Sequence, residues 1–281
     1  MMSPTGATRL AAVIGDPVRH SLSPTLMNAA FEAAGLDWTY VALEVASAGL
    51  PDAFAGVRSL GIAGLSITMP HKESAAACAD QLSPTAERLG AVNCIVNHGG
   101  LLTGHNTDGE GFVRSLQHGF SFDPSGKRCV VLGAGGSARA IILALSDAGA
   151  SEIVVVNRTL GRAERAAALA GDRGEVVALE GAHSDLADAD LVVNATSVGM
   201  GDPGSTDVPF DASVLHEGQI LVDIVYKPLE TPLIATARAQ GASVANGVAM
   251  LAHQAAVQFE LWTGVDAPID VMLASVASQL D

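Results

Sequence analysis

Short apolar runs alternate with segments of helical periodicity along most of the chain. In the N-terminal part, strands are predicted at Arg9–Gly15, Trp38–Val45, Gly64–Thr68 and Ala91–Val96. Helices are predicted from Ser23 onward, at Leu50–Leu60 and at Lys72–Ala79. Ser23 is the expected N-cap of the first helix, with Pro24 at its first position and Gly35 closing it. Strands that alternate with helices at this spacing predict a mostly parallel sheet.

The same pattern restarts after the turn-rich segment Ser121–Lys127. Strands are predicted at Arg128–Leu132, Ile153–Val156, Val176–Leu179, Leu191–Asn194, Ile220–Val225 and Ser243–Ala245. Helices are predicted at Ser137–Ala148 and Arg162–Ala170. This repetition is typical of a doubly wound nucleotide-binding fold.

The tail Val248–Gln279 loses the strand pattern and predicts two helices separated around Gly264–Pro268. Because a doubly wound unit is already complete at about Ala245, the tail is expected to pack back on the first domain. The predicted fold class is therefore α/β with two domains. Residues 1–108 plus 247–281 are expected to form a discontinuous α/β domain, and residues 109–246 a Rossmann-type doubly wound domain.

Composition and charge narrow the classes of partner. The 281 residues are 49% hydrophobic and only 4% aromatic, which suits helices packed closely on parallel sheets. A formal net charge of −15 argues against nucleic acid and membrane surfaces as partners. The three cysteines fall in no CxxC pattern, and there is neither a signal-peptide pattern nor an apolar run of ~18 residues. A cytoplasmic location with reduced thiols is expected.

A glycine-rich turn follows the predicted strand Arg128–Leu132 and opens a helix. Its residues, which match G-x-G-x-x-A, are Gly133, Ala134, Gly135, Gly136, Ser137 and Ala138. Glycines at this place permit a tight turn and let a pyrophosphate approach the backbone N–H groups of a helix N-terminus. The motif alone is common, but between a strand and a helix it predicts dinucleotide binding.

The end of the next strand bears on the choice of cofactor. NAD enzymes usually place an acidic residue there for the ribose 2′-hydroxyl. This chain has Asn157, Arg158 and Thr159, with Arg162 one helical turn later. Two guanidinium groups and a hydroxyl suit a 2′-phosphate, so NADP is predicted over NAD. The alternative is that Thr159 only caps a helix beside solvated arginines.

Several polar residues stand where packing alone would not put them. Ser21 and Ser23 could bind a carboxylate or could form a capping turn, and Lys72 follows the end of a strand, where α/β sheets bind ligands. Asn93 places an amide in an apolar strand, where it needs a partner. Asp108 opens a helix and could be an N-cap alone. Gln254 is the polar exception on a helix face, where a buried structural amide is the simpler explanation.

Nine sequence blocks carry a family resemblance. They are SLSP (Ser21–Pro24), TMPHK (Thr68–Lys72), AVN (Ala91–Asn93), NTDG (Asn106–Gly109), GAGGSARA (Gly133–Ala140), NRT (Asn157–Thr159), NATSVGM (Asn194–Met200), DIVYKPLETP (Asp223–Pro232) and NGVAMLAHQA (Asn246–Ala255). In order and spacing they resemble the shikimate dehydrogenase family, from about Val13 to Trp262. The resemblance implies a substrate domain completed by the C-terminal helices, an NADP domain and a cleft between them. It implies NADPH-dependent, reversible reduction of 3-dehydroshikimate to shikimate in aromatic amino-acid biosynthesis.

The resemblance also implies roles for residues at motif positions. The substrate carboxylate would be bound by Ser21 and Ser23, the ring hydroxyls by Thr68, Asn93 and Gln254, and Tyr226 would also face the substrate. Lys72 and Asp108 would be the catalytic pair, with Asp108 contacting the substrate too. Further cofactor contacts would come from Thr196, Ser197 and Val225, with Gly247 and Met250 beside the nicotinamide.

This assignment is chemically sensible for a ketone reduction. Negative charge develops on the ketone oxygen as hydride arrives, and the Lys72 ammonium can supply a proton. Asp108 can orient that ammonium. No HExxH or cysteine–histidine ligand set is present, so no metal is expected, and His20, His71 and His105 are not expected to be ligands.

One departure from the family pattern bears on substrate choice. The family usually has Asn two residues before the Thr68 position, whereas this chain has Ser66, which removes two amide donors. Shikimate is still the expected best substrate, and Ser23 favours it over quinate.

Alternative functions remain open beside this one. On the same fold, the chain could be a quinate or aminoshikimate dehydrogenase. The glutamyl-tRNA reductase class would need a poised cysteine and a tRNA surface, which the charge of −15 disfavours. A non-catalytic NADP-binding sensor would be expected to have lost the Lys72–Asp108 pair. A monomer and a homodimer are equally compatible with the sequence.

Overall fold

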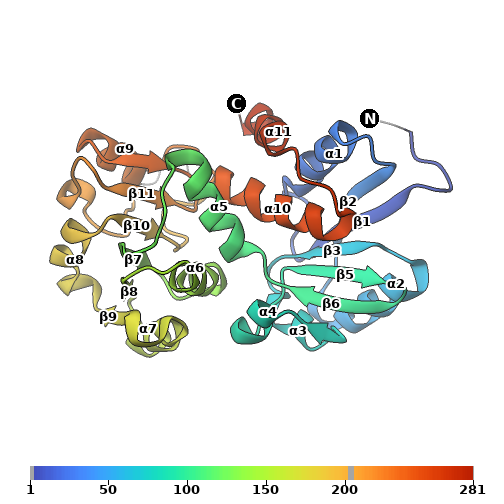
Figure 1. Cartoon of the computed structure of the whole chain (residues 1–281), viewed down its shortest axis with the longest axis horizontal. Coiled ribbons are helices and arrows are strands. Elements are labelled where there is room, and N and C mark those ends of the chain that lie inside the picture. The colour runs from blue at the N-terminus through green and yellow to red at the C-terminus, as the bar shows by residue number, and fades with distance from the viewer. Residues whose placement is uncertain (1–2, 202–205, 281) are drawn as a thin grey trace. The chain divides into compact units, whose positions relative to one another are not determined.

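Two six-stranded sheets organise the chain, each in its own compact unit (Figure 1). The computed structural model describes residues 3–201 and 206–280. The first unit comprises the chain through Thr107 together with Ala252–Gln279, and the second comprises Asp108–Leu251. The predicted α/β class with two such units is confirmed.

The sheet of the first unit has the order β2-β1-β3-β5-β6-β4. Its strands are β1 Arg9–Gly15, β2 Trp38–Glu44, β3 Gly64–Ile67, β4 Gln81–Leu82, β5 Cys94–His98 and β6 Leu101–His105. The prediction of a mostly parallel sheet is confirmed, because β1, β2, β3, β4 and β6 run in the same direction, and β5 alone is antiparallel to its neighbours β3 and β6. The reason is a hairpin: Gly99 and Gly100, with φ of 61° and 95°, join β5 to β6 in a two-residue turn.

The helix Pro84–Leu89 was not predicted, and the other helices of the first unit differ from prediction mainly at their ends. The helices are α1 Ser23–Ala33, α2 Leu50–Leu60, α3 Lys72–Ala76, α4 Pro84–Leu89, α11 Ile269–Leu280 and, from Ala252 onward, α10 Val248–Thr263. The prediction that Ser23 is the N-cap of α1 is wrong, because Leu22 already has helical φ and ψ and takes that position. The hydroxyl of Ser21 accepts the backbone N–H of Ser23 at 3.2 Å.

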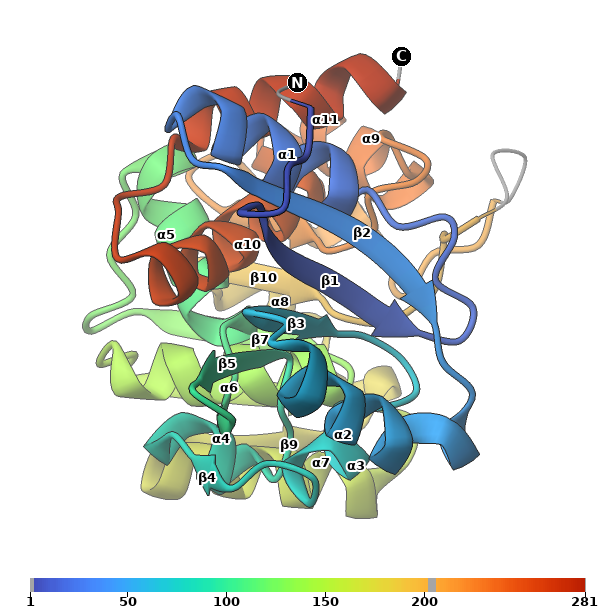
Figure 2. The same cartoon turned by 90° about the vertical axis from the view of Figure 1, so that its right-hand side faces the viewer.

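The two faces of the first sheet are packed differently. On one face, Ile14 joins the apolar cluster that contains Phe54 of α2. On the other face, the rings of Phe31 and Phe259 lie 5.4 Å apart, and Figure 2 shows α1 lying over β1 and β2 with α10 and α11 nearby. The indole N–H of Trp262 in α10 donates to the Ile95 carbonyl at 3.0 Å, which ties the C-terminal segment to β5.

The sheet of the second unit is wholly parallel, with the order β12-β11-β10-β7-β8-β9. Its strands are β7 Arg128–Leu132, β8 Glu152–Val156, β9 Gly174–Val177, β10 Leu191–Asn194, β11 Ile220–Asp223 and β12 Ser243–Ala245. The chain direction across the sheet reverses between β7 and β10, which is the doubly wound arrangement that sequence periodicity predicts. Ligands bind such sheets beyond the carboxyl ends of the strands at this point.

Helices cover both faces of the second sheet. They are α5 Asp108–Phe120, α6 Gly136–Asp147, α7 Leu160–Ala167, α8 His183–Asp188 and α9 Pro232–Ala239, with the first turn of α10. Alternate residues of each strand face opposite ways, so Val131 packs with Phe112 of α5, whereas Val130 packs with Leu233 of α9. Both faces of the central strands are thereby buried, so a ligand can approach them at the strand ends.

Candidate active site

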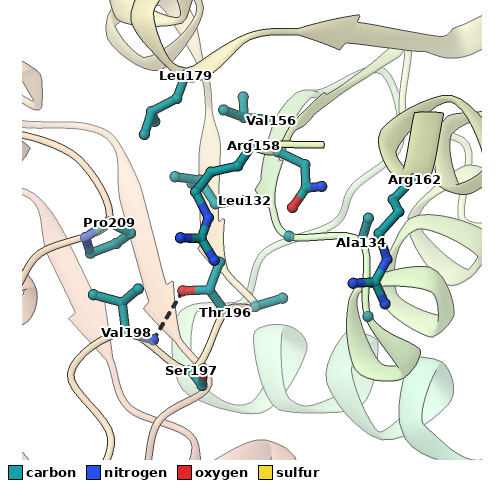
Figure 3. Close-up of a pocket in the computed structure, with 14 residues that line it drawn as sticks. Leu132, Ala134, Val156, Arg158, Arg162, Leu179, Thr196, Ser197, Val198 and Pro209 are labelled. Atoms are coloured by element: carbon teal, nitrogen blue, oxygen red, sulfur yellow. Dashed lines mark hydrogen bonds between the residues drawn. The ribbon is translucent and has the colours of Figure 1, made fainter. Parts of the chain in front are cut away.

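A cavity of about 310 Å³ lies in the second unit at the carboxyl ends of β7, β8 and β10 (Figure 3). The described residues that line it are Leu132, Gly133, Ala134, Gly135, Val156, Asn157, Arg158, Arg162, Leu179, Ala195, Thr196, Ser197, Val198 and Pro209. Eight residues of the predicted cofactor set are thus brought together: Gly133, Ala134, Gly135, Asn157, Arg158, Arg162, Thr196 and Ser197.

The glycine turn gives this cavity a backbone wall. Gly133 has φ of 113°, and a Cβ there would lie 2.8 Å from the Ala195 carbonyl oxygen, so both its conformation and its surroundings require glycine. Gly135 is the N-cap of α6 and is exposed. The first N–H groups of α6 have no partners within the helix, and they make this wall suitable for a pyrophosphate.

Two arginines give the cavity its positive charge. Arg158 follows β8 and Arg162 lies in the first turn of α7, and both are exposed. In Figure 3, Arg158 extends toward Thr196, whereas Arg162 lies beside Ala134. No carboxylate is among the described residues that line this cavity. The arrangement suits an anionic group such as a phosphate.

The alternative explanation of this turn, in which Thr159 only caps a helix, agrees with the structure in part. Thr159 is the N-cap of α7, but its hydroxyl makes no capping hydrogen bond. Instead, the amide of Asn157 donates to the Thr159 carbonyl at 3.0 Å and shapes the turn that carries Arg158.

The opposite wall is built on a buried polar residue at the end of β10. Asn194 accepts from the backbone N–H and the hydroxyl of Thr196, at 3.1 and 2.7 Å. The Thr196 hydroxyl in turn accepts from the Val198 N–H at 3.2 Å, the bond drawn in Figure 3. Sequence reasoning missed the apolar part of this wall, formed by Leu179, Val198 and Pro209, because loop segments carry no periodic signal.

The other predicted cofactor residues do not line this cavity: Gly136, Ser137, Ala138, Thr159, Val225, Gly247 and Met250. The Gly247 N–H donates to the Val225 carbonyl at 3.0 Å, and a Cβ at Gly247 would collide with the Ile224 carbonyl. Met250 is buried in the core beneath the sheet. Tyr226 is half-buried, and burial raises the pKa of its hydroxyl, which therefore stays protonated near neutral pH.

A buried polar cluster in the first unit brings Asn93 and Gln254 together. The Asn93 side-chain oxygen accepts the Thr107 N–H at 2.8 Å, and its amide nitrogen donates to the Thr107 hydroxyl at 3.0 Å. That hydroxyl in turn donates to the backbone carbonyl of Gln254 at 3.0 Å. Asn93 and Thr107 are almost fully buried, and Gln254 is half-buried. Their amide groups can bind hydroxyl oxygens of a polar ligand.

Ser66 extends this cluster toward Ser23. The Tyr40 hydroxyl donates to Ser66 at 2.5 Å and also hydrogen-bonds Ser23, and the Ser66 hydroxyl donates to the side chain of Gln258. Burial raises the pKa of Tyr40, so it remains a phenol. Sequence reasoning missed Tyr40, Thr107 and Gln258.

Three other predicted site residues lie at or next to the ends of helices and strands, namely Lys72, Thr68 and Asp108. Lys72 is the first residue of α3, and its carbonyl accepts the N–H of Val92, the neighbour of Asn93, at 2.8 Å. Thr68 follows β3 and packs closely on Gly15. A Cβ added at Gly15 would lie 2.5 Å from the methyl carbon of Thr68. Asp108 is the first residue of α5 and is buried, next in the chain to Thr107.

The fold and these two clusters define a class: a dehydrogenase-like protein with a dinucleotide-binding unit and a separate α/β unit rich in buried polar groups. Family models match three parts of the chain. They describe a shikimate dehydrogenase substrate binding domain at residues 13–95, a shikimate/quinate 5-dehydrogenase at 116–201, and a shikimate 5′-dehydrogenase C-terminal domain at 247–277.

Full-length relatives agree with these models. The chain is 45% identical to a shikimate dehydrogenase (NADP(+)) of Methanopyrus kandleri, over 97% of this chain and 96% of the relative. It is 46% identical to one of Moorella thermoacetica, over 97% and 94%. The chain belongs to the shikimate dehydrogenase family, and these two relatives are NADP-dependent oxidoreductases.

Solved structures are similar over almost the whole chain. Shikimate 5-dehydrogenase from Thermus thermophilus, in complex with NADP(H) and shikimate, has a TM-score of 0.88 at 39% identity, covering 96% of this chain and 99% of the other. Quinate dehydrogenase from Corynebacterium glutamicum, in complex with NAD, also has a TM-score of 0.88, at 33% identity and with the same coverage.

Within the described residues, no three His, Cys, Asp or Glu side chains gather where they could hold a metal ion. None of the helices there has the length and apolar character needed to cross a membrane.

Proposed function

We propose that this chain catalyses the reversible, NADPH-dependent reduction of 3-dehydroshikimate to shikimate, in aromatic amino-acid biosynthesis. The observation that carries the proposal is the cavity lined by Arg158 and Arg162, because two guanidinium groups suit the 2′-phosphate of NADP. The chain that carries this cavity belongs to the shikimate dehydrogenase family. The names of the full-length relatives support the same cofactor and substrate.

The cofactor site is assigned to the cavity of the second unit. Backbone N–H groups of the Gly133–Gly135 turn would hold the pyrophosphate, and Arg158 and Arg162 the 2′-phosphate. The apolar wall with Leu179 would cover the adenine. Val225, Gly247 and Met250 are proposed for the nicotinamide end. When bound, NADPH supplies the hydride.

The substrate site is assigned to the first unit, and Tyr226 is proposed to face the substrate as well. Ser21 and Ser23 would bind the carboxylate, and Thr68, Asn93 and Gln254 the ring hydroxyls. The Asn93–Thr107 hydrogen bonds support this assignment, because they fix one of these amides before a ligand arrives.

Lys72 is proposed as the proton donor. Hydride addition to the carbonyl carbon leaves both electrons of the former π bond on oxygen, and the Lys72 ammonium gives that oxygen its proton. In the reverse direction neutral Lys72 accepts the hydroxyl proton. Asp108 is proposed to orient the ammonium and to hydrogen-bond the same hydroxyl, which keeps the geometry fixed.

The domain assignment rests on these roles. We propose residues 1–108 plus 247–281 as the substrate domain and residues 109–246 as the NADP domain. The partner is a small molecule, and neither nucleic acid nor a membrane is proposed, given the net charge of −15. A cytoplasmic location is proposed, and a monomer or homodimer is compatible with this fold.

The test is absorbance at 340 nm with shikimate or quinate as substrate, each with NADP and with NAD. Turnover with shikimate and NADP at a kcat/KM well above the other three pairs is expected. A higher kcat/KM for quinate would instead support a quinate dehydrogenase, the second candidate, which Ser66 and the similarity to the Corynebacterium glutamicum enzyme favour. No turnover with any pair would overturn both candidates.

A further inference from the structure

We propose that Gln258 is a positioning residue that, held by Ser66, makes Gln254 present its amide N–H groups to the substrate. The proposal rests on the function proposed above, because it concerns how the substrate site is arranged. Gln258 lies one helical turn after Gln254 on α10, and its Nε2 donates to the Gln254 Oε1 at 2.8 Å.

The orientation of the Gln258 amide is set by a group that can only accept. The backbone carbonyl of Asn93 lies 3.4 Å from one end of the amide, so that end must be the NH₂ group. The other end, Oε1, then faces Ser66 and can only accept. Ser66 must therefore donate to Gln258, and its oxygen is left to accept the proton of Tyr40.

The direction of these hydrogen bonds determines which end of the Gln254 amide can bind a ligand. Its Oε1 accepts the N–H of Gln258, so its amide nitrogen is the end that can donate to a ligand oxygen. In Asn93 the nitrogen is likewise the donor end of the amide, because its side-chain oxygen accepts the Thr107 N–H while its nitrogen donates one N–H to the Thr107 hydroxyl. The site thus presents two amide donors, which matches substrate hydroxyl oxygens acting as acceptors.

Burial separates the roles of the two glutamines. Gln258 is 1% exposed and Ser66 8%, whereas Gln254 is half-buried. Gln258 therefore acts through Gln254. In a cluster this well shielded from solvent, loss of the Gln258 partner lets the Gln254 amide rotate or bind a water molecule instead. The direction in which its N–H groups point is then no longer fixed.

The test is a double-mutant cycle on kcat and KM, with shikimate affinity also measured by titration calorimetry. Gln258→Met keeps the length of the side chain and removes both polar atoms. Gln258→Met and Gln254→Ala are each expected to raise the KM and Kd for shikimate about tenfold, the equivalent of one hydrogen bond, with the KM for NADP unchanged. The double variant is expected to be no weaker than Gln254→Ala alone, because both changes remove the same interaction.

Two further variants separate positioning from general loss of structure. Ser66→Ala is a smaller change and is expected to raise the KM for shikimate in the same direction, without adding to Gln258→Met. The control is Gln219→Met, since Gln219 is equally buried but bonds backbone carbonyls of Leu186 and Ala189 in the second unit. It is expected to lower Tm and leave the KM for shikimate unchanged.

The outcomes distinguish this inference from the function on which it rests. Wild-type protein that turns over no shikimate would overturn the proposed function and this inference with it. Active wild type with an unchanged KM in Gln258→Met, or with effects that multiply in the double variant, would overturn the inference alone.

Discussion

The side chain of Lys72 is the one proton donor that the proposed reaction needs. Replacing it in Lys72→Met keeps the length of the stem and removes the ammonium. We expect kcat for shikimate oxidation to fall by about 10²–10⁴, the usual contribution of a positioned acid or base, with a much smaller change in KM. Lys127→Met is the control, because Lys127 forms a partly exposed ion pair with Asp190 at 3.2 Å and belongs to neither proposed site. A fall in kcat of less than tenfold would remove Lys72 from this role.

The two cavity arginines are expected to act on cofactor choice alone. In Arg158→Ala and Arg162→Ala, the KM for NADP should rise about 10–100-fold, because each variant loses charge-assisted bonds worth roughly 1.5–3 kcal/mol. The KM for NAD, which lacks the 2′-phosphate, should change little. Arg165→Ala is a matched control from the same helix, since Arg165 is exposed but does not line the cavity. Equal losses with NADP and NAD would contradict 2′-phosphate recognition.

What could be predicted at this scale depended on whether a residue stands out from its neighbours in the chain. Arg158 and Arg162 stand out after an apolar strand, and they do line one cavity. Tyr40 does not, because an aromatic residue suits its strand, although a buried hydroxyl always needs a partner. Gln258 could have been found from its i+4 spacing to Gln254. Thr107 could not, since its partners are Asn93, which lies just before β5, and Gln258 of α10, 151 residues further along the chain.

Among the elements, α5 depends on a close approach to α6. A Cβ at Gly109 would lie 2.5 Å from the Ala140 carbonyl oxygen, whereas one at Gly119, near the exposed end of the same helix, would meet nothing within 4 Å. Gly109→Ala is therefore expected to lower the free energy of unfolding by about 1–3 kcal/mol through overpacking. Gly119→Ala should raise it by about 0.5–1 kcal/mol, because alanine loses less entropy in a helix. Urea unfolding measures both, and equal effects would show that the helices do not constrain Gly109.

Asp223 makes the end of β11 sensitive to pH. Its carboxylate accepts from Asn194, the Val225 N–H and Thr231, yet burial is the larger effect and raises its pKa above the ordinary value of 3.8. The pKa of Asp223 is higher in the folded than in the unfolded chain. The protonated carboxyl group therefore contributes stability that is fully present below pH 3.8 and is lost as pH rises through the folded pKa.

Asp223→Asn tests this sign. Relative to the variant, wild type should lose unfolding free energy as pH rises from 3.8 through the raised pKa, by about 1.4 kcal/mol for each unit by which the pKa is raised. Chemical denaturation at several pH values measures the difference. Wild type that gains on the variant as pH rises would mean that the hydrogen bonds outweigh burial.

Elements with a strong local pattern could be predicted well. The strands Arg9–Gly15, Arg128–Leu132 and Leu191–Asn194 have the predicted bounds, because each is a continuous apolar run buried on both faces. Strand β6 was missed and β5 misplaced. The β6 sequence LLTGH has little alternation, although the glycine pair before it is a hairpin signal.

At the scale of the whole molecule, the return of the C-terminal segment to the first unit could be inferred by counting strands. A doubly wound sheet needs six strands, and the sixth, β12, ends at Ala245. The remaining C-terminal residues must pack elsewhere, and Ala252–Gln279 indeed lies in the first unit. The mixed sheet of that unit could not be inferred in this way, because antiparallel pairing depends on turns rather than on periodicity.

The excess of acidic over basic residues, 30 against 15, acts on the molecule as a whole. Like charges repel one another more strongly in the folded chain, where they are closer together, and salt screens this repulsion. Raising NaCl from about 10 to about 150 mM shortens the screening length from about 30 to about 8 Å. We therefore expect Tm to rise with NaCl, by about 2–4 °C for each kcal/mol of repulsion relieved.

Potassium chloride at the same ionic strength should give the same rise in Tm, because screening depends on ionic strength and not on the identity of the cation. Scanning calorimetry of the full chain without ligands measures both series. A Tm that falls with salt would mean that the exposed ion pairs, such as Arg58–Asp80 at 2.9 Å and Arg238–Glu230 at 2.8 Å, outweigh the net repulsion. That outcome would be unexpected, since exposed pairs typically contribute no more than about 1 kcal/mol each.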